Sequence, residues 1–196
     1  MKIKQAQSKN LKVSDFEMRK GQSWCVYGKP DDGVCELVRW ITQGFVDGEC
    51  KKFEIPYNTG VVSFEKQQAV YETELKNDQT DYLDKIDPGT PARNFLTRID
   101  RFRQLISDFD MADHLDMGYR QLSCGQSRKL MILEQITKGV ECLVIENPFE
   151  GLDNQTRKEL DRALLMLSKA GAGILIMVHN SVDIPDWVTH AALIED

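Results

Sequence analysis

Apolar residues follow two different spacings along this chain. Short apolar runs predict strands, and apolar residues at i, i+3, i+4 and i+7 predict the buried stripe of a helix. The predicted strands are 11–16, 23–26, 61–64, 142–145, 174–178 and 191–194, and the predicted helices are 34–41, 126–138 and 154–170. Apolar strands that alternate with helices are typical of a mostly parallel sheet covered on both faces.

The middle of the chain, from about 67 to 119, has a different character. It is polar and charged, and its apolar residues are mostly spaced as in helices. Thr90 and Pro91 predict the start of one helix, with threonine as the N-cap and proline at the first position. Residues 95–109 predict another helix. We therefore expect a helical part inserted into an α/β domain.

Composition limits the size of the fold and the kinds of partner that we expect. A chain of 196 residues, 41% hydrophobic and 29% charged, suits one compact globular domain. The net charge of −6 and the lack of a basic cluster argue against a nucleic-acid partner. No apolar run approaches the ~20 residues of a membrane span, and no apolar signal segment follows Met1. We expect a cytoplasmic protein that reaches a membrane only through a partner.

The cysteines give no sign of a metal site in their spacing. The chain has five of them, and none are spaced like a zinc knuckle or a redox pair. We expect reduced thiols, mostly buried, and no structural metal.

A loop between the strand at 23–26 and the helix at 34–41 begins and ends with glycine. The pattern Gly-x-x-x-x-Gly-Lys-Ser/Thr binds nucleotides because its amides hold phosphates, its lysine reaches the β and γ oxygens, and its hydroxyl binds Mg²⁺. Gly28 and Gly33 keep the two glycine positions, but Val34 replaces the lysine and Cys35 replaces the hydroxyl residue. A thiol is a poor ligand for a hard cation. The loop therefore lacks both side chains that hold Mg-nucleotide.

The residues inside this loop also disfavour an anion. Pro30 removes an amide donor, and Asp31 and Asp32 place carboxylates where phosphate would lie. Like unit charges about 5 Å apart repel by roughly 3 kcal/mol at an effective dielectric of about 20. Loss of the lysine removes a further ~1.5–3 kcal/mol. Lys29 stands where some divergent loops carry a second lysine, but the acidic pair remains, so we expect phosphate affinity to be lower by a few orders of magnitude.

Four later segments follow the polar middle in a fixed order. They are Leu122-Ser123-Cys124-Gly125-Gln126, Glu146-Asn147, Gly151-Leu152-Asp153 and His179. Together with the glycine loop, they resemble the ATPase domain of the ABC family over nearly the whole chain. The resemblance implies an α/β fold: a P-loop NTPase core with a mostly parallel sheet, a small antiparallel N-terminal part and a helical subdomain inserted at about 67–119. Residues 1–196 would form one such domain.

The resemblance implies a nucleotide site in this chain with several altered positions. Glu146 stands at the Walker B aspartate that holds Mg²⁺, and is one methylene longer. Asn147 stands at the catalytic glutamate and cannot act as a carboxylate base. His179 stands at the switch histidine, although a histidine after an apolar strand can also be structural. The nucleotide-binding positions would be Gly28, Lys29, Gly33, Val34 and Cys35 in the loop, and Lys66 and Gln67 in the Q-loop.

Other positions of the family serve a nucleotide that is bound by the opposite protomer. Leu122, Ser123, Cys124, Gly125 and Gln126 resemble the signature motif Leu-Ser-Gly-Gly-Gln, with Cys124 in place of a glycine. A serine hydroxyl, a glycine amide and a helix N-terminus form a seat for an anion. Ser123 could instead be only an N-cap. Gly151, Leu152 and Asp153 resemble the D-loop.

A closer resemblance is to tandem ABC ATP-binding proteins that are associated with molybdate transport. It is carried by 63–65, 148–153 and 184–188. Such proteins have two ABC domains and no transmembrane segments. This sequence accounts for one such domain, which would be either a single-domain relative or the first half of a longer protein.

The altered positions lie in the elements that serve the chain's own nucleotide. The loop, Walker B and Q-loop positions serve the chain's own nucleotide and are altered, whereas the signature and D-loop are kept. The sequence therefore favours an ABC-type ATP-binding domain, impaired in its own site, that supplies its signature to an ABC partner in a homo- or heterodimer within a transport-associated or regulatory assembly. ATP and Mg²⁺ would act mainly through the partner's site. The alternatives are an active ATPase subunit that energises transport and an interaction module that does not use nucleotide.

Overall fold

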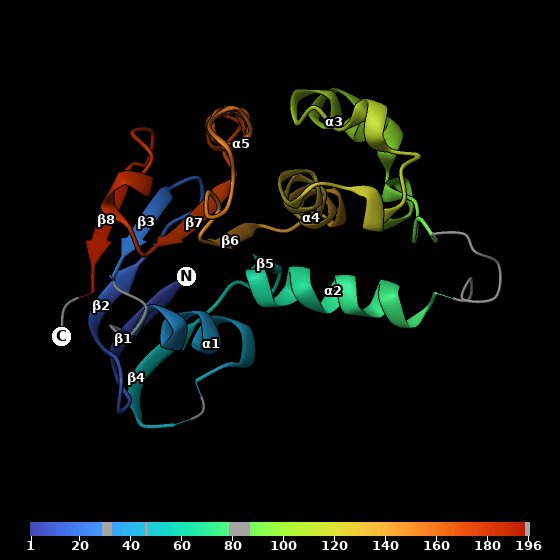
Figure 1. Cartoon of the computed structure of the whole chain (residues 1–196). Helices are drawn as coiled ribbons and strands as arrows, with labels where there is room; N and C mark the ends of the chain where they lie inside the picture. The colour runs from blue at the N-terminus through green and yellow to red at the C-terminus, as the bar shows by residue number, and fades with distance from the viewer. Residues whose placement is uncertain (29–32, 46, 79–86, 195–196) are drawn as a thin grey trace. The chain divides into compact units, whose positions relative to one another are not determined.

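The computed structural model describes residues 1–28, 33–45, 47–78 and 87–194 (Figure 1). The strands are β1 Lys2–Gln7, β2 Lys12–Glu17, β3 Ser23–Tyr27, β4 Glu49–Glu54, β5 Thr59–Val62, β6 Cys142–Glu146, β7 Gly173–Val178 and β8 His190–Leu193. The α-helices are α1 Cys35–Gln43, α2 Phe64–Lys76, α3 Arg103–Asp108, α4 Cys124–Lys138 and α5 Asn154–Lys169. Short 3₁₀ helices cover Ala92–Phe95, Ile99–Phe102, Ala112–His114, Tyr119–Gln121 and Ser181–Asp183.

The chain divides into two compact units. Unit 1 contains Met1–Val61, Glu141–Pro148 and Leu165–Asp196, and unit 2 contains Val62–Val140 and Phe149–Leu164.

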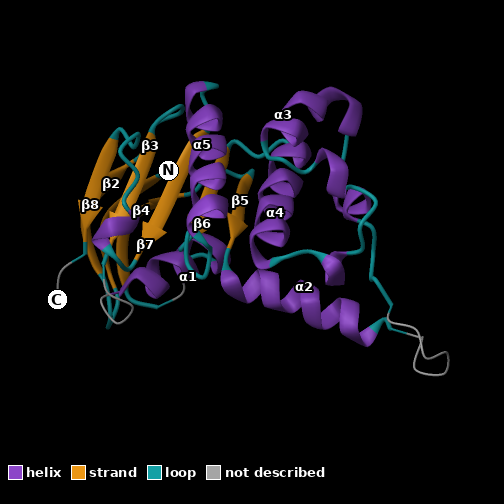
Figure 2. Cartoon of the chain, turned by 45° about the horizontal axis from the view of Figure 1, so that its top comes forward, coloured by secondary structure: helices purple, strands orange, loops and turns teal. Residues whose placement is uncertain are grey.

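Unit 1 is built on two sheets. A five-stranded sheet has the order β5-β6-β7-β3-β8, and β6, β7, β3 and β8 pair in parallel (Figure 2). A three-stranded sheet has the order β2-β1-β4 and is antiparallel. The predicted α/β class, with a mostly parallel sheet and a small antiparallel part, is confirmed.

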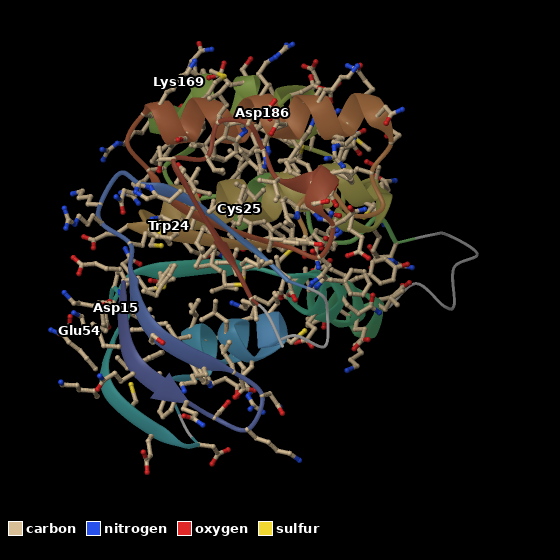
Figure 3. All side chains as sticks on the ribbon, turned by 90° about the vertical axis from the view of Figure 1, so that its left-hand side faces the viewer. Asp15, Trp24, Cys25, Glu54, Lys169 and Asp186 are labelled. Carbon is tan, nitrogen blue, oxygen red and sulfur yellow. The ribbon has the colours of Figure 1, made fainter. Side chains whose placement is uncertain are left out.

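The core of unit 1 follows the period of two that strands impose. Val144 of β6 and Leu175 and Met177 of β7 pack in one cluster with α1 and the antiparallel sheet. Trp24 and Cys25 are neighbours on β3 and lie on opposite faces of the sheet (Figure 3). All six residues of β7 are buried, as expected for a central parallel strand.

The outer strands of the antiparallel sheet carry charged side chains. Asp15 on β2 and Glu54 on β4 are labelled in Figure 3. Lys4 Nζ lies 3.2 Å from Asp15 Oδ2, and Lys52 Nζ lies 2.9 Å from Glu54 Oε1. These pairs are exposed, so each adds little stability.

Unit 2 is organised around α4. Its residues Leu130, Ile132 and Leu133 are fully buried. Lys129 on the same helix is 3% exposed, and its Nζ lies 2.8 Å from Oε2 of Glu159 on α5. The helix ends at Gly139, which has the left-handed φ of 87° that favours glycine after a helix.

The predicted helix over 95–109 is wrong in its extent. Arg98 adopts a left-handed φ of 52°, and the α-helical part, α3, begins only at Arg103. The reason is tertiary, because Thr97 Oγ1 donates to the carbonyl of Thr137 at 2.7 Å and Arg98 Nε donates to the same oxygen at 3.1 Å. These bonds hold the segment to the last turn of α4 and interrupt the helix.

The predicted helix start at Thr90 and Pro91 is also wrong. Pro91 has an extended ψ of 137° and is itself the cap of a single 3₁₀ turn that starts at Ala92. The amide of Thr90 donates to Oε2 of the buried Glu74 at 2.6 Å, so this segment is anchored to α2.

The cysteines are less buried than predicted. Cys25 and Cys142 are buried and Cys50 is half-buried, but Cys35 and Cys124 are exposed. Burial raises the pKa of Cys25 to about 12 and that of Cys142 to about 11, so these two thiols stay protonated and inert at neutral pH. Both exposed thiols stand at positions of the predicted nucleotide motifs.

Among the described residues, no helix is both long enough and apolar enough to cross a membrane.

Candidate functional site

The predicted phosphate loop connects β3 to α1. Lys29, Pro30, Asp31 and Asp32 lie outside the described residues. Val34, at the lysine position, is completely buried and belongs to the core of unit 1. Its side chain is therefore packed inside unit 1.

Both glycines of the loop have a packing role. A Cβ on Gly28 would lie 2.9 Å from Cγ2 of Val34, and a Cβ on Gly33 would lie 2.8 Å from the carbonyl oxygen of Asn10. Gly33 also has a left-handed φ of 92°. The two glycines are thus explained by close packing, whether or not the loop binds phosphate.

The predicted Walker B residues follow β6 directly. Glu146 ends the strand, is half-buried and pairs in register with Met177 of β7. Asn147 has a left-handed φ of 43°, and its amide donates to the carbonyl of Met177 at 2.8 Å. Asparagine is among the few residue types that adopt this conformation at low cost. A glutamate at this position would be strained.

Three candidate residues of unit 1 converge at the carboxyl ends of the strands. Cys35 Sγ, a carboxylate oxygen of Glu146 and a ring nitrogen of His179 all lie within 4.8 Å of one another. His179 Nδ1 lies 3.0 Å from the carbonyl oxygen of Gly28. The structure therefore brings together the hydroxyl, Walker B and switch-histidine positions that the sequence named separately.

Phe16, the aromatic residue upstream of the loop that the sequence offers for stacking on a base, belongs to the core of unit 1. It is 8% exposed and packs its edge against Trp24, with ring centroids 4.9 Å apart and planes at 66°.

The predicted Q-loop residues lie in the first turn of α2, in unit 2. Ser63 caps this helix by accepting from the amide of Lys66. Partial burial lowers the pKa of Lys66. Gln67 turns its amide toward α4, where Nε2 donates to Ser127 Oγ at 2.7 Å and to the carbonyl of Cys124 at 3.3 Å. Gln67 therefore links α2 to the first turn of α4.

The predicted signature segment forms the start of α4, a helix of 15 residues. Ser123 and Gln126 make a reciprocal capping box: Ser123 Oγ accepts from the Gln126 amide at 3.2 Å, and Gln126 Oε1 accepts from the Ser123 amide at 2.9 Å. Leu122 is half-buried, while Ser123 and Cys124 are exposed. The positive end of a long helix thus has a hydroxyl and a thiol on its exposed tip.

Gly125 is buried against α5 within unit 2. A Cβ at this position would lie 2.3 Å from Cγ2 of Thr156. Close packing of two helices therefore requires glycine here.

We expect Gly125→Ala to destabilise the protein by about 1–3 kcal/mol, the usual cost of overpacking. Thr156→Ser removes the methyl group that the new Cβ would meet, so the double variant should regain most of this loss. Chemical denaturation of the single and double variants measures both values. If Thr156→Ser gave no recovery, the packing explanation for Gly125 would be wrong.

The predicted D-loop leads into α5. Gly151 has a left-handed φ of 72°, and Leu152 is half-buried. Asp153 accepts from the Thr156 hydroxyl at 2.6 Å and from the amides of Thr156 and Gln155 at 3.0 and 2.9 Å. These hydrogen bonds lower the pKa of the Asp153 carboxyl. In the structure, Asp153 is a helix cap that also lies at an exposed surface.

Sequence reasoning missed two buried cations that follow the signature. Arg128 is 5% exposed, and it donates from Nη1 to the carbonyl of Glu150 at 2.8 Å and from Nε to Gln67 Oε1 at 3.4 Å. Burial lowers the pKa of this guanidinium. Lys129 is paired with Glu159. The sequence signal for these buried residues was a pair of adjacent cationic residues within the helix predicted over 126–138.

Comparison with known proteins gives a consistent result. No protein-family model matches the chain. The ABC transporter ATP-binding protein ModF of Escherichia coli (strain K12) is 25% identical over 197 residues, which cover 96% of this chain and 40% of that protein. An uncharacterised ABC transporter ATP-binding protein of Schizosaccharomyces pombe is 24% identical over 199 residues, which cover 92% of this chain and 41% of that protein. The chain spans about two fifths of the length of these two relatives.

Solved structures resemble this fold at low sequence identity. An ATP-binding cassette of an ABC transporter in its ADP conformation matches with a TM-score of 0.66 and 14% identity, covering 94% of this chain and 81% of that chain. A metal-chelate-type ABC transporter in an inward-facing conformation matches with a TM-score of 0.71 and 13% identity, covering 94% of this chain and 72% of that chain.

Proposed function

We propose that this chain is an ABC-type ATP-binding domain that is impaired in its own nucleotide site and completes the ATP site of a partner. The chain is homologous to ABC transporter ATP-binding proteins and has the fold of their ATPase domains. Its own nucleotide site binds Mg-ATP weakly or not at all. Its signature segment, Leu122–Gln126, completes the ATP site of an ABC partner with an intact phosphate loop.

The impairment of the chain's own site is supported first by the burial of Val34. The nucleotide pattern needs an ammonium at this position to reach the β and γ phosphates. Here the side chain is apolar and 0% exposed, so it supplies no ammonium group and does not reach solvent. Cys35 and Asn147 add a thiol in place of the Mg²⁺-binding hydroxyl and an amide in place of the catalytic carboxylate.

The start of α4 supports the proposal that this chain completes a partner's ATP site. Ser123 and Cys124 are exposed there, and the capping box holds the serine backbone in place. A helix N-terminus with exposed donors attracts phosphate oxygens. The contrast between the buried Val34 and the exposed Ser123 is the observation that carries this proposal.

Calorimetric titration of the full chain with Mg-ATP tests the first half of the proposal. We expect no saturable binding at micromolar nucleotide and no ATP turnover by the chain alone. An ABC domain with an intact phosphate loop, titrated in parallel, is the positive control. Micromolar binding together with turnover would instead establish the chain as an active ATPase subunit.

An interaction module that does not use nucleotide is the second candidate, and one observation favours it. Each polar or small residue of the signature also has a partner within unit 2. Gly125 packs on Thr156, Ser123 bonds with Gln126, and Gln126 Nε2 lies 3.2 Å from His114 Nε2. These contacts explain the segment as the start of a packed helix, without a role for nucleotide. The substitutions at Ser123 described in the Discussion separate the two candidates.

The assembly that we propose is associated with transport or its regulation. The relatives are named as transporter ATP-binding proteins. The partner ABC domain, in a homo- or heterodimer, would provide any contact with a membrane subunit, and the chain would act on the cytoplasmic side.

A further inference from the structure

We propose that Cys35, Glu146 and His179 form a binding site for a Zn²⁺-type divalent cation. One ligand atom from each residue lies within 4.8 Å of the other two, and this is the only such trio of metal-ligating side chains in the described part of the chain. The site goes beyond the function proposed above, because it needs neither nucleotide nor a partner protein.

The fold places the three residues at or next to the ends of regular elements. Glu146 is the last residue of β6, and His179 directly follows β7, its parallel neighbour. Cys35 is the first residue of α1, the helix that comes after β3, and β3 is the other neighbour of β7. Three adjacent parallel strands therefore place the trio at one edge of the sheet, where their carboxyl ends meet.

The histidine is held in the form that a metal requires. Its Nδ1 lies 3.0 Å from the carbonyl oxygen of Gly28. A carbonyl only accepts hydrogen bonds, so the neutral ring carries its proton on Nδ1 and keeps a lone pair on Nε2. A backbone carbonyl that fixes the free ring nitrogen in this way is the usual outer partner of a metal-binding histidine.

The set of donor atoms selects the class of cation. Thiolate, imidazole and carboxylate together suit Zn²⁺, whereas Mg²⁺ prefers oxygen ligands in an octahedron. Three protein ligands leave a fourth tetrahedral position for water. The substitution of Cys35 for a hydroxyl residue, which weakens the site for Mg²⁺, is therefore the change that suits it to zinc.

The spacing lies within reach of tetrahedral geometry. Zn²⁺ bonds of about 2.0–2.3 Å place ligand atoms roughly 3.3–3.7 Å apart. The present limit of 4.8 Å is larger by about 1.1–1.5 Å, which rotations of the cysteine and glutamate side chains can close. Cys35 is exposed and Glu146 and His179 are half-buried, so an ion can enter without opening the core.

Metal titration of the purified full chain tests this site. After treatment with a chelator, the chain is titrated with Zn²⁺ in competition with a chromophoric chelator. It is also titrated with Co²⁺, which gives a thiolate-to-cobalt absorption band in the near ultraviolet when a cysteine binds it. We expect equimolar binding and a cobalt band.

Four variants assign the ligands. Cys35→Ser should remove the cobalt band and weaken zinc binding by at least about tenfold, and Glu146→Gln and His179→Ala should each weaken zinc binding similarly. Cys124→Ser is the matched control, because Cys124 is also exposed but lies in unit 2, outside the trio. Far-ultraviolet circular dichroism verifies that each variant is folded.

Three results would overturn the assignment. They are a folded wild-type chain without saturable zinc binding, unchanged affinity in Cys35→Ser, and an equal loss in Cys124→Ser. Because no nucleotide or partner is present, the outcome does not depend on whether the chain completes a partner's ATP site.

Discussion

Replacement of Ser123 by aspartate is expected to lower the ATPase rate of an ABC partner by about two orders of magnitude. In the composite site that we propose, the new carboxylate would face the γ-phosphate. Like unit charges about 5 Å apart repel by roughly 3 kcal/mol at an effective dielectric of about 20. That energy corresponds to a factor of about 100 in rate or affinity.

Ser123→Asn is the matched control for this experiment. Asparagine has nearly the shape of aspartate without the charge, and both residues cap helices as well as serine does. The capping box that positions the start of α4 should therefore survive in both variants. We expect Asn to reduce the partner's rate by less than about tenfold, the loss of one hydroxyl contact.

The readout is ATP hydrolysis by an equimolar mixture of the chain and an ABC domain with an intact phosphate loop. Rates that are equal for wild type, Asp and Asn would support the interaction module. A large loss in both variants, with the fold intact, would point to the hydroxyl and not to phosphate charge.

The ion pair between Lys129 and Glu159 gives the second large expected effect, this time on stability. Lys129 is 3% exposed, whereas the side chain of Glu159 is 33% exposed. Glu159→Met would leave a buried ammonium without its carboxylate, and we expect it to cost about 3–5 kcal/mol. Lys129→Met removes the buried charge and keeps the volume, and we expect less than about 1.5 kcal/mol because the remaining carboxylate reaches water.

The double variant completes a thermodynamic cycle. With methionine at both positions, no buried charge remains, so its stability should be close to that of Lys129→Met and well above that of Glu159→Met. Urea denaturation gives the free energies of unfolding. Equal losses in the two single variants would contradict the asymmetry in burial.

The same pair has an expected dependence on pH. The hydrogen bond from Lys129 lowers the pKa of Glu159 below its usual value of 4.5. A carboxyl with a lowered folded-state pKa contributes stability above its unfolded pKa and loses it as the pH falls through the folded value. The wild type should therefore lose this contribution below about pH 4.5, and Lys129→Met should not show that part of the loss.

The sequence predicted the elements with strong apolar runs and missed those without them. β6 and β7 were predicted almost in full because nearly every residue is apolar and buried. β1 and β4 were not predicted, because β1 buries only Ile3 and Ala6 and β4 has no buried residue. Their pairing with each other, and not their composition, makes them strands.

The candidate site was also predicted only in part. Cys35, Glu146 and His179 were each named from motif positions, but nothing in a linear sequence shows that their side chains meet within 4.8 Å. That meeting follows from the strand order β6-β7-β3, which pairs segments far apart in the chain. Burial of Val34, by contrast, was predicted, because this residue opens the apolar stripe of the helix predicted over 34–41.

The tryptophans make the two units separately observable. All three, Trp24, Trp40 and Trp187, belong to unit 1, and Trp24 stacks on His190 with centroids 4.6 Å apart. α2, α3, α4 and most of α5 belong to unit 2. Indole fluorescence thus follows the unfolding of unit 1 alone, while helical ellipticity follows mainly unit 2. A single denaturation series read by both signals tells whether the sheet-bearing and helical parts of this chain melt together or one after the other.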